Sequence, residues 1–576
     1  MSAQTGTPSL PPPPPSSRGL GRVREQVRHL RSAPNPVLLR EMRQFARLTR
    51  TPLLLMTVTV LAALLFAAIG GVASQATTPA LTGVWIFHTY FSVGFFAVGF
   101  AGPAIAANTI ASERDGRTWE ALQLTGLSPG VVARGKFLAS YTHVALYLVM
   151  VAPVGALPFL FGGVTLTEVL AAFVWLFVLA GLAVAFGLAV SSRLETMRSA
   201  ISVTLLVAFF LVPTAYTMLG PVLSIAAHEA WSAVPEGPPV WLPTALERAP
   251  FSWEYLGVLV AAPIAAVALP AWFFYEATIA NLTSVTEDRS TGLRRWFLVT
   301  TAVLGAAGAT LVLASSASDR PSASAFAESL LFCHLAFSCF VFAGEPIAPS
   351  RRVLARWDAE GATFVRRALG PGVMRAALTV LAAGLSATAL VLLASVAGLS
   401  LAGRPRPADF ASVVLVGGYA AAFLVFVVGF AAFVRARSNS SGGTRVLLLV
   451  MLFLVAAGPF IVAAIVGAFT HDESLVVAAP SPIYALVAAS AIRKATTATG
   501  RSLPMIACVA MSAVWALAGT VLLARASARC RAIVLRHEDA VREGDALLAA
   551  EDAAHEASER AAETAAAEPV TEGGGA

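Results

Sequence analysis

One short segment has the spacing of a nucleotide-binding motif. Gly130, Gly135 and Lys136 fit the pattern Gly-x-x-x-x-Gly-Lys-Ser/Thr, in which backbone amides and the lysine hold phosphates and the last hydroxyl binds Mg²⁺. Phe137 replaces that hydroxyl, and the segment leads into an apolar stretch instead of following a buried strand. We therefore predict that this chain has no nucleotide site of its own. The four cysteines also lack metal-ligand spacing, so we predict no metal site. We likewise predict no catalytic residue and no cofactor bound by this chain.

A second candidate is a charged segment between two apolar stretches. Its residues 117–125 predict a short amphipathic helix with Trp119, Leu122 and Leu124 as apolar anchors, which suits a groove on a soluble partner. The alternative is that the segment only caps the two adjoining helices. The residues predicted to form this docking loop are Glu113, Arg114, Gly116, Arg117, Thr118, Trp119, Glu120 and Leu122.

An amphipathic segment at 35–52 precedes the first apolar stretch. Leu38, Met42 and Phe45 share one helical face, and arginines occupy the other, so we expect the segment to lie along the membrane interface. It either sets the topology or connects the membrane helices to a partner. The residues of interest in it are Asn35, Pro36, Arg40, Glu41 and Arg43.

Several short patterns occur twice, about 245 residues apart, in the same order. The pairs include His88-x-x-Phe-Ser with His334-x-x-Phe-Ser, Asp115-Gly116-x-Thr118-Trp119 with Glu360-Gly361-x-Thr363-Phe364, and Pro213 with Pro459. A constant order and offset predict an internal duplication. Glu360, Gly361, Thr363 and Phe364 are then the second-half equivalent of the docking loop.

Composition predicts an integral membrane protein. Hydrophobic residues make up 57% of the 576 positions and charged residues 13%, and the mean hydropathy is +0.74, outside the usage of soluble proteins. Continuous apolar runs of about 20 residues favour helices over strands. The expected fold is an all-α polytopic protein with about 12 transmembrane helices in two parallel six-helix halves.

The domain boundaries follow from these runs. We expect a disordered Pro-rich leader at 1–34, an interfacial helix at 35–52, six-span halves at 53–290 and 291–535, and an acidic Ala-rich tail at 536–576. Segment 475–492 is interrupted by two prolines, so we interpret it as re-entrant or interfacial. A full span there is the alternative.

Arginines cluster before the first span, whereas the loop 74–84 has no charge. The positive-inside rule then predicts a cytoplasmic amino terminus. With an even number of spans, the carboxyl terminus is also cytoplasmic, and we expect a multi-pass protein of the bacterial inner (plasma) membrane.

Two of these segments resemble one known family. Asn35-Pro36-Val-Leu-x-Arg40-Glu41-x-Arg43 resembles the connecting helix of ABC-2 type transporter permeases, and Glu113 to Pro129 resembles the loop after their second span. The chain departs from the family pattern by an added Arg117 and by Gly126 in place of proline. The likeness covers about residues 35–290.

The resemblance implies a permease that exports a substrate, with ATP and Mg²⁺ bound on two separate ATPase subunits that dock on the inner loops. It also implies a path lined by the second and fifth spans, whose aromatic residues suit an amphipathic cargo. The pathway candidates are His88, Phe95, Phe96, Phe209, Phe210, Pro213, Tyr216, His334 and Pro459. For the two histidines, a helix–helix hydrogen bond is the alternative role.

Other function classes stay open at this point. One chain supplies both halves, with a homodimer as the alternative, and we expect lipid but no nucleic acid as a further partner. Glu113-Arg114-x-Gly116-Arg117 also fits the Asp-Arg-x-Gly-Arg pattern of ion- or proton-coupled secondary transporters of the major facilitator type. The amphipathic helix and the long inner loop count against that class, and a non-transporting scaffold leaves the paired prolines unexplained.

Overall fold

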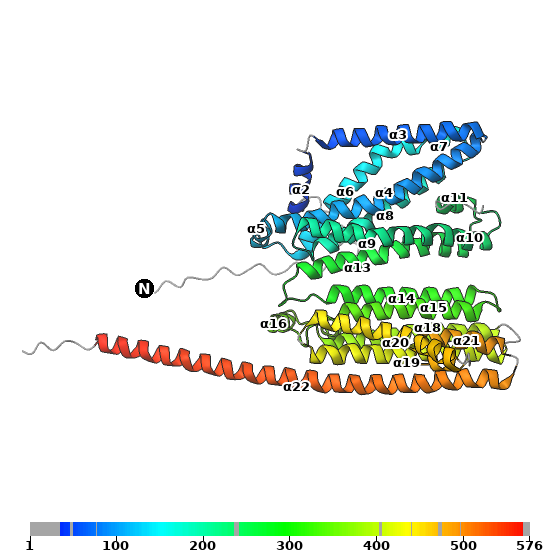
Figure 1. Cartoon of the computed structure of the whole chain (residues 1–576). Helices are drawn as coiled ribbons and strands as arrows, with labels where there is room; N and C mark the ends of the chain where they lie inside the picture. The colour runs from blue at the N-terminus through cyan, green and yellow to red at the C-terminus, as the bar shows by residue number, and fades with distance from the viewer. Residues whose placement is uncertain are drawn as a thin grey trace, which may run out of the picture. The chain divides into compact units, whose positions relative to one another are not determined.

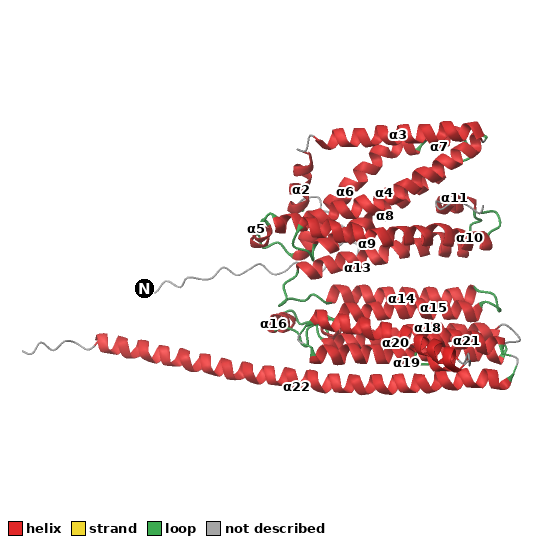
Figure 2. Ribbon diagram, viewed as in Figure 1, coloured by secondary structure: helices red, strands yellow, loops and turns green. Residues whose placement is uncertain are grey.

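The computed structural model describes residues 35–46, 50–76, 78–234, 241–401, 406–438, 440–470, 475–495 and 497–567. Within these ranges all regular elements are helices, and none is a strand (Figure 2). Eleven of the described helices are long and apolar enough to cross a membrane. The predictions of an all-helical fold and of a multi-pass membrane protein are therefore confirmed. The predicted leader at 1–34 lies outside the described residues.

The chain divides into two compact units, Met1–Thr283 (unit 1) and Ser284–Ala576 (unit 2). This division falls close to the boundary expected between 290 and 291. The expected first span coincides with α3, whose apolar segment Thr59–Val72 is shorter than the other candidates.

Unit 1 is a bundle built around α4 and α8. Its membrane-length segments are α4 (Pro79–Asp115), α6 (Pro129–Gly155) with α7 (Leu157–Phe161), α8 (Leu166–Ser191), α9 (Met197–Thr217) with α10 (Leu223–Ala230), and α13 (Ala262–Leu282). The shorter or flanking helices are α2 (Pro36–Ala46), α3 (Arg50–Ala76), α5 (Trp119–Leu124), α11 (Trp241–Arg248) and α12 (Trp253–Tyr255). In Figure 1, α8, α9 and α13 run alongside one another, and α5 lies at one end of the unit.

Unit 2 is a second bundle, in which α19 packs along α22 (Figure 1). Its helices are α14 (Thr291–Ala314), α15 (Arg320–Phe342), α16 (Arg351–Ala359), α17 (Phe364–Ala368), α18 (Val373–Leu401), α19 (Pro407–Arg437), α20 (Ser441–Thr470), α21 (Pro482–Lys494) and α22 (Ala498–Ala567). The helix α22 has 70 residues, about 105 Å at 1.5 Å per residue, so it continues far beyond the bundle. The acidic tail expected from 536 is thus helical as far as Ala567.

The segment 475–492 forms a short 3₁₀ turn followed by α21. This helix has 13 residues, about 20 Å, which is less than the roughly 30 Å of a hydrocarbon core. Tyr484 and Ala488 on it are buried, and Arg493 at its end pairs with Asp409 at 3.1 Å. Its length and burial agree with the interpretation of a piece that does not span the membrane.

Small residues let the long helices approach closely. A Cβ atom on Gly187 of α8 would lie 2.1 Å from the carbonyl oxygen of Pro103 on α4. In unit 2, a Cβ on Gly519 of α22 would lie 2.5 Å from the amide nitrogen of Phe426 on α19. Helices in lipid associate through such backbone contacts, because apolar side chains gain little from leaving lipid for protein.

We therefore expect Gly187→Ala to destabilise unit 1 by about 1–3 kcal/mol, the usual cost of overpacking. The measurement is thermal unfolding of the purified protein in detergent. Gly71→Ala is the matched control, because that glycine lies in α3 with nothing within 4 Å of its added Cβ. Alanine favours a helix over glycine by about 1 kcal/mol, so the control should unfold at an equal or higher temperature. Equal unfolding temperatures for both variants would contradict the packing argument.

Candidate functional site

A fully buried lysine ties three elements of unit 1 together. Lys136 of α6 has no exposed side-chain surface, and its Nζ lies 3.1 Å from Glu41 of α2 and 3.1 Å from Glu113 of α4. The same Nζ donates a hydrogen bond to the carbonyl oxygen of Thr109 at 3.1 Å. Arg40 of α2 completes the group through an ion pair with Glu113. We call Arg40, Glu41, Glu113 and Lys136 the charge cluster.

The interfacial helix α2 sits directly on α6. Asn35 caps α2, since its Oδ1 accepts the amide hydrogen of Val37 at 2.9 Å, and its Nδ2 donates to the carbonyl oxygen of Val131 at 2.8 Å. A Cβ on Gly135 would lie 2.7 Å from the Cβ of Val37, so only glycine allows this approach. The glycine and lysine that resemble a phosphate-binding loop therefore hold α2 in place. Pro36 begins α2, where its missing amide hydrogen costs nothing.

The two predicted regions thus meet in space. Arg40 and Glu41 from the interfacial helix contact Glu113 from the docking loop and Lys136, whereas Arg43 is exposed and outside the cluster. The sequence predicted no ionic contact for Lys136, which was noted as part of the incomplete nucleotide-binding pattern. Its role could have been suspected from a single lysine at the start of an apolar helix, a position that requires a carboxylate partner in a buried environment.

The docking helix is oriented differently from the expectation. Leu122 is buried and Trp119 half-buried, and both pack with Val37 and Val132 in the core of unit 1. Only Leu124 among the three predicted anchors is turned outward, with 88% of its surface exposed. The expectation that all three contact a partner is therefore corrected, because two of them hold α5 against α2 and α6.

The remaining docking-loop residues form the turn between α4 and α5. The guanidinium of Arg114 lies over the Trp119 ring at 5.4 Å and donates to the carbonyl oxygen of Leu194 at 3.3 Å. Thr118 caps this turn through a hydrogen bond from its Oγ1 to the carbonyl oxygen of Glu113 at 3.3 Å. The other three predicted members, which are solvent-exposed, are Gly116, Arg117 and Glu120.

Two departures from the family pattern have a backbone explanation. Arg117 has φ 56°, a left-handed conformation that costs a non-glycine residue about 1–2 kcal/mol. Gly126 has φ 70°, which proline cannot adopt because its ring fixes φ near −65°. Proline at position 126 would therefore require a different backbone conformation.

The second-half loop is built differently. Here α15 ends at Phe342, and a separate helix, α16, precedes the residues Glu360 and Gly361. By residue type, Gly361 aligns with Gly116. Its φ of 57° instead matches the φ of 56° at Arg117, so the two loops place their left-handed residue at different positions of the repeated pattern. Thr363 caps α17, and Phe364 is 85% exposed.

Arginines surround this second loop. Arg356 and Arg366 lie 2.8 Å and 2.6 Å from the carboxylate of Glu360. The hydrogen bond from Arg356 makes the largest contribution, followed by that from Arg366, and together they hold the pKa of Glu360 below its usual range. Arg367 lies 2.9 Å from Asp358, so the arginines closest to Phe364 in the sequence are paired with carboxylates.

Unit 2 contains a buried ion pair that sequence reasoning missed. Arg294 of α14 has no exposed side-chain surface and lies 3.4 Å from Glu345, which follows α15. Glu345 also accepts hydrogen bonds from Ser290 Oγ at 2.7 Å and from the amide of Gly372 at 3.2 Å. Burial raises the pKa of Glu345, and Arg294 opposes that shift. The available signal was an arginine just inside a span, which needs a partner when it cannot reach water.

The two repeated histidines differ in their contacts. His334 of α15 shares a hydrogen bond with Thr301 of α14, Nε2 to Oγ1 at 3.1 Å, which is the helix–helix bond considered as the alternative. His88 is buried, and its Nδ1 has no partner among the described residues. Ser92 and Ser338 each donate to the carbonyl oxygen of the preceding histidine, at 2.6 Å and 2.9 Å.

The structure brings only some of the pathway aromatics together. Tyr216 of α9 packs on Phe95 and Phe96 of α4, with ring centroids 5.3 Å and 4.8 Å apart. Its hydroxyl donates to Ser92 Oγ at 2.9 Å. Phe209 and Phe210 are each 64% exposed and do not join this group.

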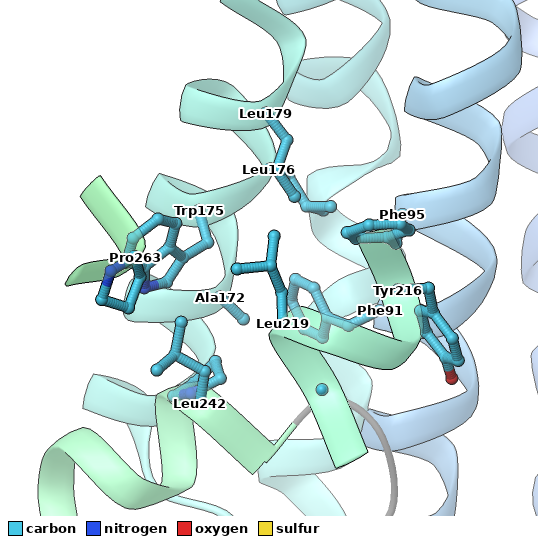
Figure 3. Close-up of a pocket in the computed structure, with 12 residues that line it drawn as sticks. Phe91, Phe95, Ala172, Trp175, Leu176, Leu179, Tyr216, Leu219, Leu242 and Pro263 are labelled. Atoms are coloured by element: carbon cyan, nitrogen blue, oxygen red, sulfur yellow. The ribbon is translucent and has the colours of Figure 1, made fainter. Parts of the chain in front are cut away.

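Phe95 and Tyr216 border a small cavity in unit 1 (Figure 3). Its volume is about 60 Å³, which is room for about two waters and far below the roughly 300 Å³ of a typical ligand pocket. Pro213 lies in α9, which passes into a π-helical turn at Met218–Val222, whereas α20 continues unbroken past Pro459. In this conformation Tyr216, Phe95 and Phe96 pack together between α4 and α9.

Comparison with known proteins does not assign the chain to a family. No protein-family model matches it. No curated protein has a matching sequence either. Function must therefore be inferred from the site itself.

We expect Lys136→Met to destabilise the protein by about 3–5 kcal/mol, because it leaves two carboxylates facing one another without the buried cation. Unfolding temperature and the yield of monodisperse protein in detergent measure the effect. Arg134→Met is the matched control, since Arg134 is exposed two residues earlier on α6. Adding Glu41→Gln and Glu113→Gln to Lys136→Met should recover part of the loss. A Lys136→Met protein as stable as the control would show that the cluster is not a structural tie.

Proposed function

We propose that this chain is the permease subunit of an ATP-driven exporter of the ABC-2 type, acting with separate ATPase subunits. The observation that carries the proposal is the charge cluster, which joins the interfacial helix α2, the end of α4 and the start of α6 around Lys136. The likeness of α2 and of the loop after α4 to the family segments supports it. The two segments with that likeness are the ones that contact each other.

An exporter of this kind needs a stiff connection between the ATPase and the membrane helices. In unit 1, α5 is anchored by Trp119 and Leu122 to the same core that holds Val37 of α2. A push on α5 would therefore be transmitted to α2, α4 and α6 together, because buried and well-packed elements move as one body. A loop that only capped two helices would not need this ionic and apolar fixation.

The surfaces offered for docking differ between the two units. On α5 the outward residues are Leu124 and Glu120, whereas beside α17 they are Phe364 and its neighbouring arginines. We propose that two ATPase subunits dock, one on each surface, and that they make different contacts. ATP and Mg²⁺ are then bound by the ATPases and not by this chain.

The further parts of the proposal come from the family likeness and the charge distribution. The two units act as the two permease halves, arisen by duplication, in the bacterial inner membrane with both termini in the cytoplasm. The cargo is amphipathic, and export is the direction. Separate ATPase subunits are the principal partners, together with the lipid bilayer.

Leu124→Asp should abolish copurification of an ATPase with the full chain from native membranes, because it replaces the exposed apolar side chain at the end of α5 with a charge. The readout is ATPase activity of the eluate and identification of the bound subunit by mass spectrometry. Leu547→Asp is the matched control, since Leu547 is a similarly exposed leucine on α22.

Both variants should insert and unfold like the unaltered protein, because neither leucine is buried. ATPase capture that survives Leu124→Asp would contradict docking at α5. Transport in vesicles driven by a proton gradient without ATP would instead favour the secondary-transporter alternative.

A further inference from the structure

Unit 2 contains a cavity of about 280 Å³ among α15, α19, α20 and α21. Its wall is largely apolar and includes three aromatic rings. The aromatic residues are Phe332, Tyr419 and Phe423. Phe423 lies 5.5 Å from Phe332 and 6.5 Å from Tyr419, centroid to centroid, so the rings form a continuous aromatic surface.

One carboxyl group lines this cavity, and it has no partner. Glu328 of α15 is 2% exposed, and neither of its carboxylate oxygens has a hydrogen-bond partner among the described residues. Of the cavity-lining residues that the structure describes, it is the only charged one. Every other buried carboxylate discussed above is paired with an arginine or a lysine.

The polar groups nearest to Glu328 in the cavity wall are already used. Ser329 donates its hydroxyl to the carbonyl oxygen of Ala325 at 2.7 Å. The Tyr419 hydroxyl is occupied by the carbonyl oxygens of Ala479 and Pro480, at 2.9 Å each, and by the indole nitrogen of Trp515, also at 2.9 Å. Among the described residues, neither hydroxyl of the cavity wall donates to the carboxylate.

Neither of two described arginines of this region hydrogen-bonds to Glu328. Arg320, about two helical turns before Glu328 on α15, donates to the carbonyl oxygen of Gly398 at 2.6 Å. Arg493 at the end of α21 pairs with Asp409 of α19 at 3.1 Å. A buried carboxylate without a partner is costly, and intramembrane carboxyls generally serve a function, so a cationic ligand that entered this cavity would stabilise Glu328 in its charged form.

The residues of the cavity wall favour some kinds of ligand over others. A metal ion such as Ca²⁺ needs six or more oxygen ligands, whereas the described cavity wall offers one carboxylate and the two hydroxyls of Ser329 and Tyr419, which are already hydrogen-bonded. An organic ammonium is bound by one anion and by aromatic faces, whose negative charge distribution attracts the cation. We propose that this cavity binds a small amphipathic organic cation, with its ammonium group on Glu328 and its apolar part against Phe332, Tyr419 and Phe423.

The test uses the full chain in lipid nanodiscs and equilibrium dialysis with benzyltrimethylammonium. Its neutral carbon isostere, neopentylbenzene, is the matched ligand without charge. The unaltered protein should bind the cation saturably, and Glu328→Gln should weaken that binding at least ten-fold while leaving the neutral ligand within about two-fold. Since the assay contains neither ATP nor an ATPase, its result is independent of the proposed permease function.

Glu276→Gln is the matched control, because Glu276 also lies within a membrane-length helix but accepts a hydrogen bond from Trp272 Nε1 at 3.0 Å. It should leave cation binding unchanged. Ala456→Phe, which fills the cavity and keeps the carboxyl, should abolish binding of both ligands and serves as the decisive variant if Glu328→Gln does not fold. Equal cation affinity in Glu328→Gln and the unaltered protein, or no saturable binding by the latter, would overturn the proposal. So would unchanged cation binding in Ala456→Phe.

Discussion

The arrangement of unit 1 depends on the burial of one positive charge. Lys136 has no contact with solvent, so its ammonium must be compensated within the protein. Two carboxylates meet this requirement, Glu41 from α2 and Glu113 from α4. Because these residues are far apart in the chain, neutralising one lysine fixes the interfacial helix α2 and the membrane-length helices α4 and α6 in one geometry. The orientation of α5 follows, since its core contacts include Val37 of α2.

Unit 2 meets a similar requirement with other residues. Its buried cation is Arg294 on α14 and its carboxylate is Glu345, beyond the end of α15. A guanidinium can donate to several acceptors in one plane, and Arg294 does so to the carbonyl oxygens of Ala368 and Gly372, at 3.1 Å and 3.0 Å. The loop before α18 is thereby fixed without a copy of α2. Similar residue patterns in the two loops are thus supported by different ionic contacts.

Against these paired groups, Glu328 stands apart. A protein that neutralises Glu113 and Glu345 so fully has no structural need for an unpaired carboxyl between apolar helices, where glutamine or leucine would cost less. Glu113 and Glu345 hold helices together through ion pairs. Glu328 instead lines a cavity and has no hydrogen-bond partner among the described residues. The aromatic rings beside Glu328 and the cavity in front of it agree with the second role.

The helical class, the membrane character and the approximate helix positions could be predicted from the amino-acid sequence, because continuous apolar runs in lipid must satisfy their backbone hydrogen bonds internally. The residue patterns also drew attention to α2 and to the loop after α4. Which side chains meet could not be predicted and became visible in the folded chain. Trp119 and Leu122 turned inward, and Lys136, Arg294 and Glu328 took roles that residue type does not specify. The reason is physical: periodicity records which face of a helix is apolar, whereas the pairing of a buried charge depends on helices that are distant in the chain.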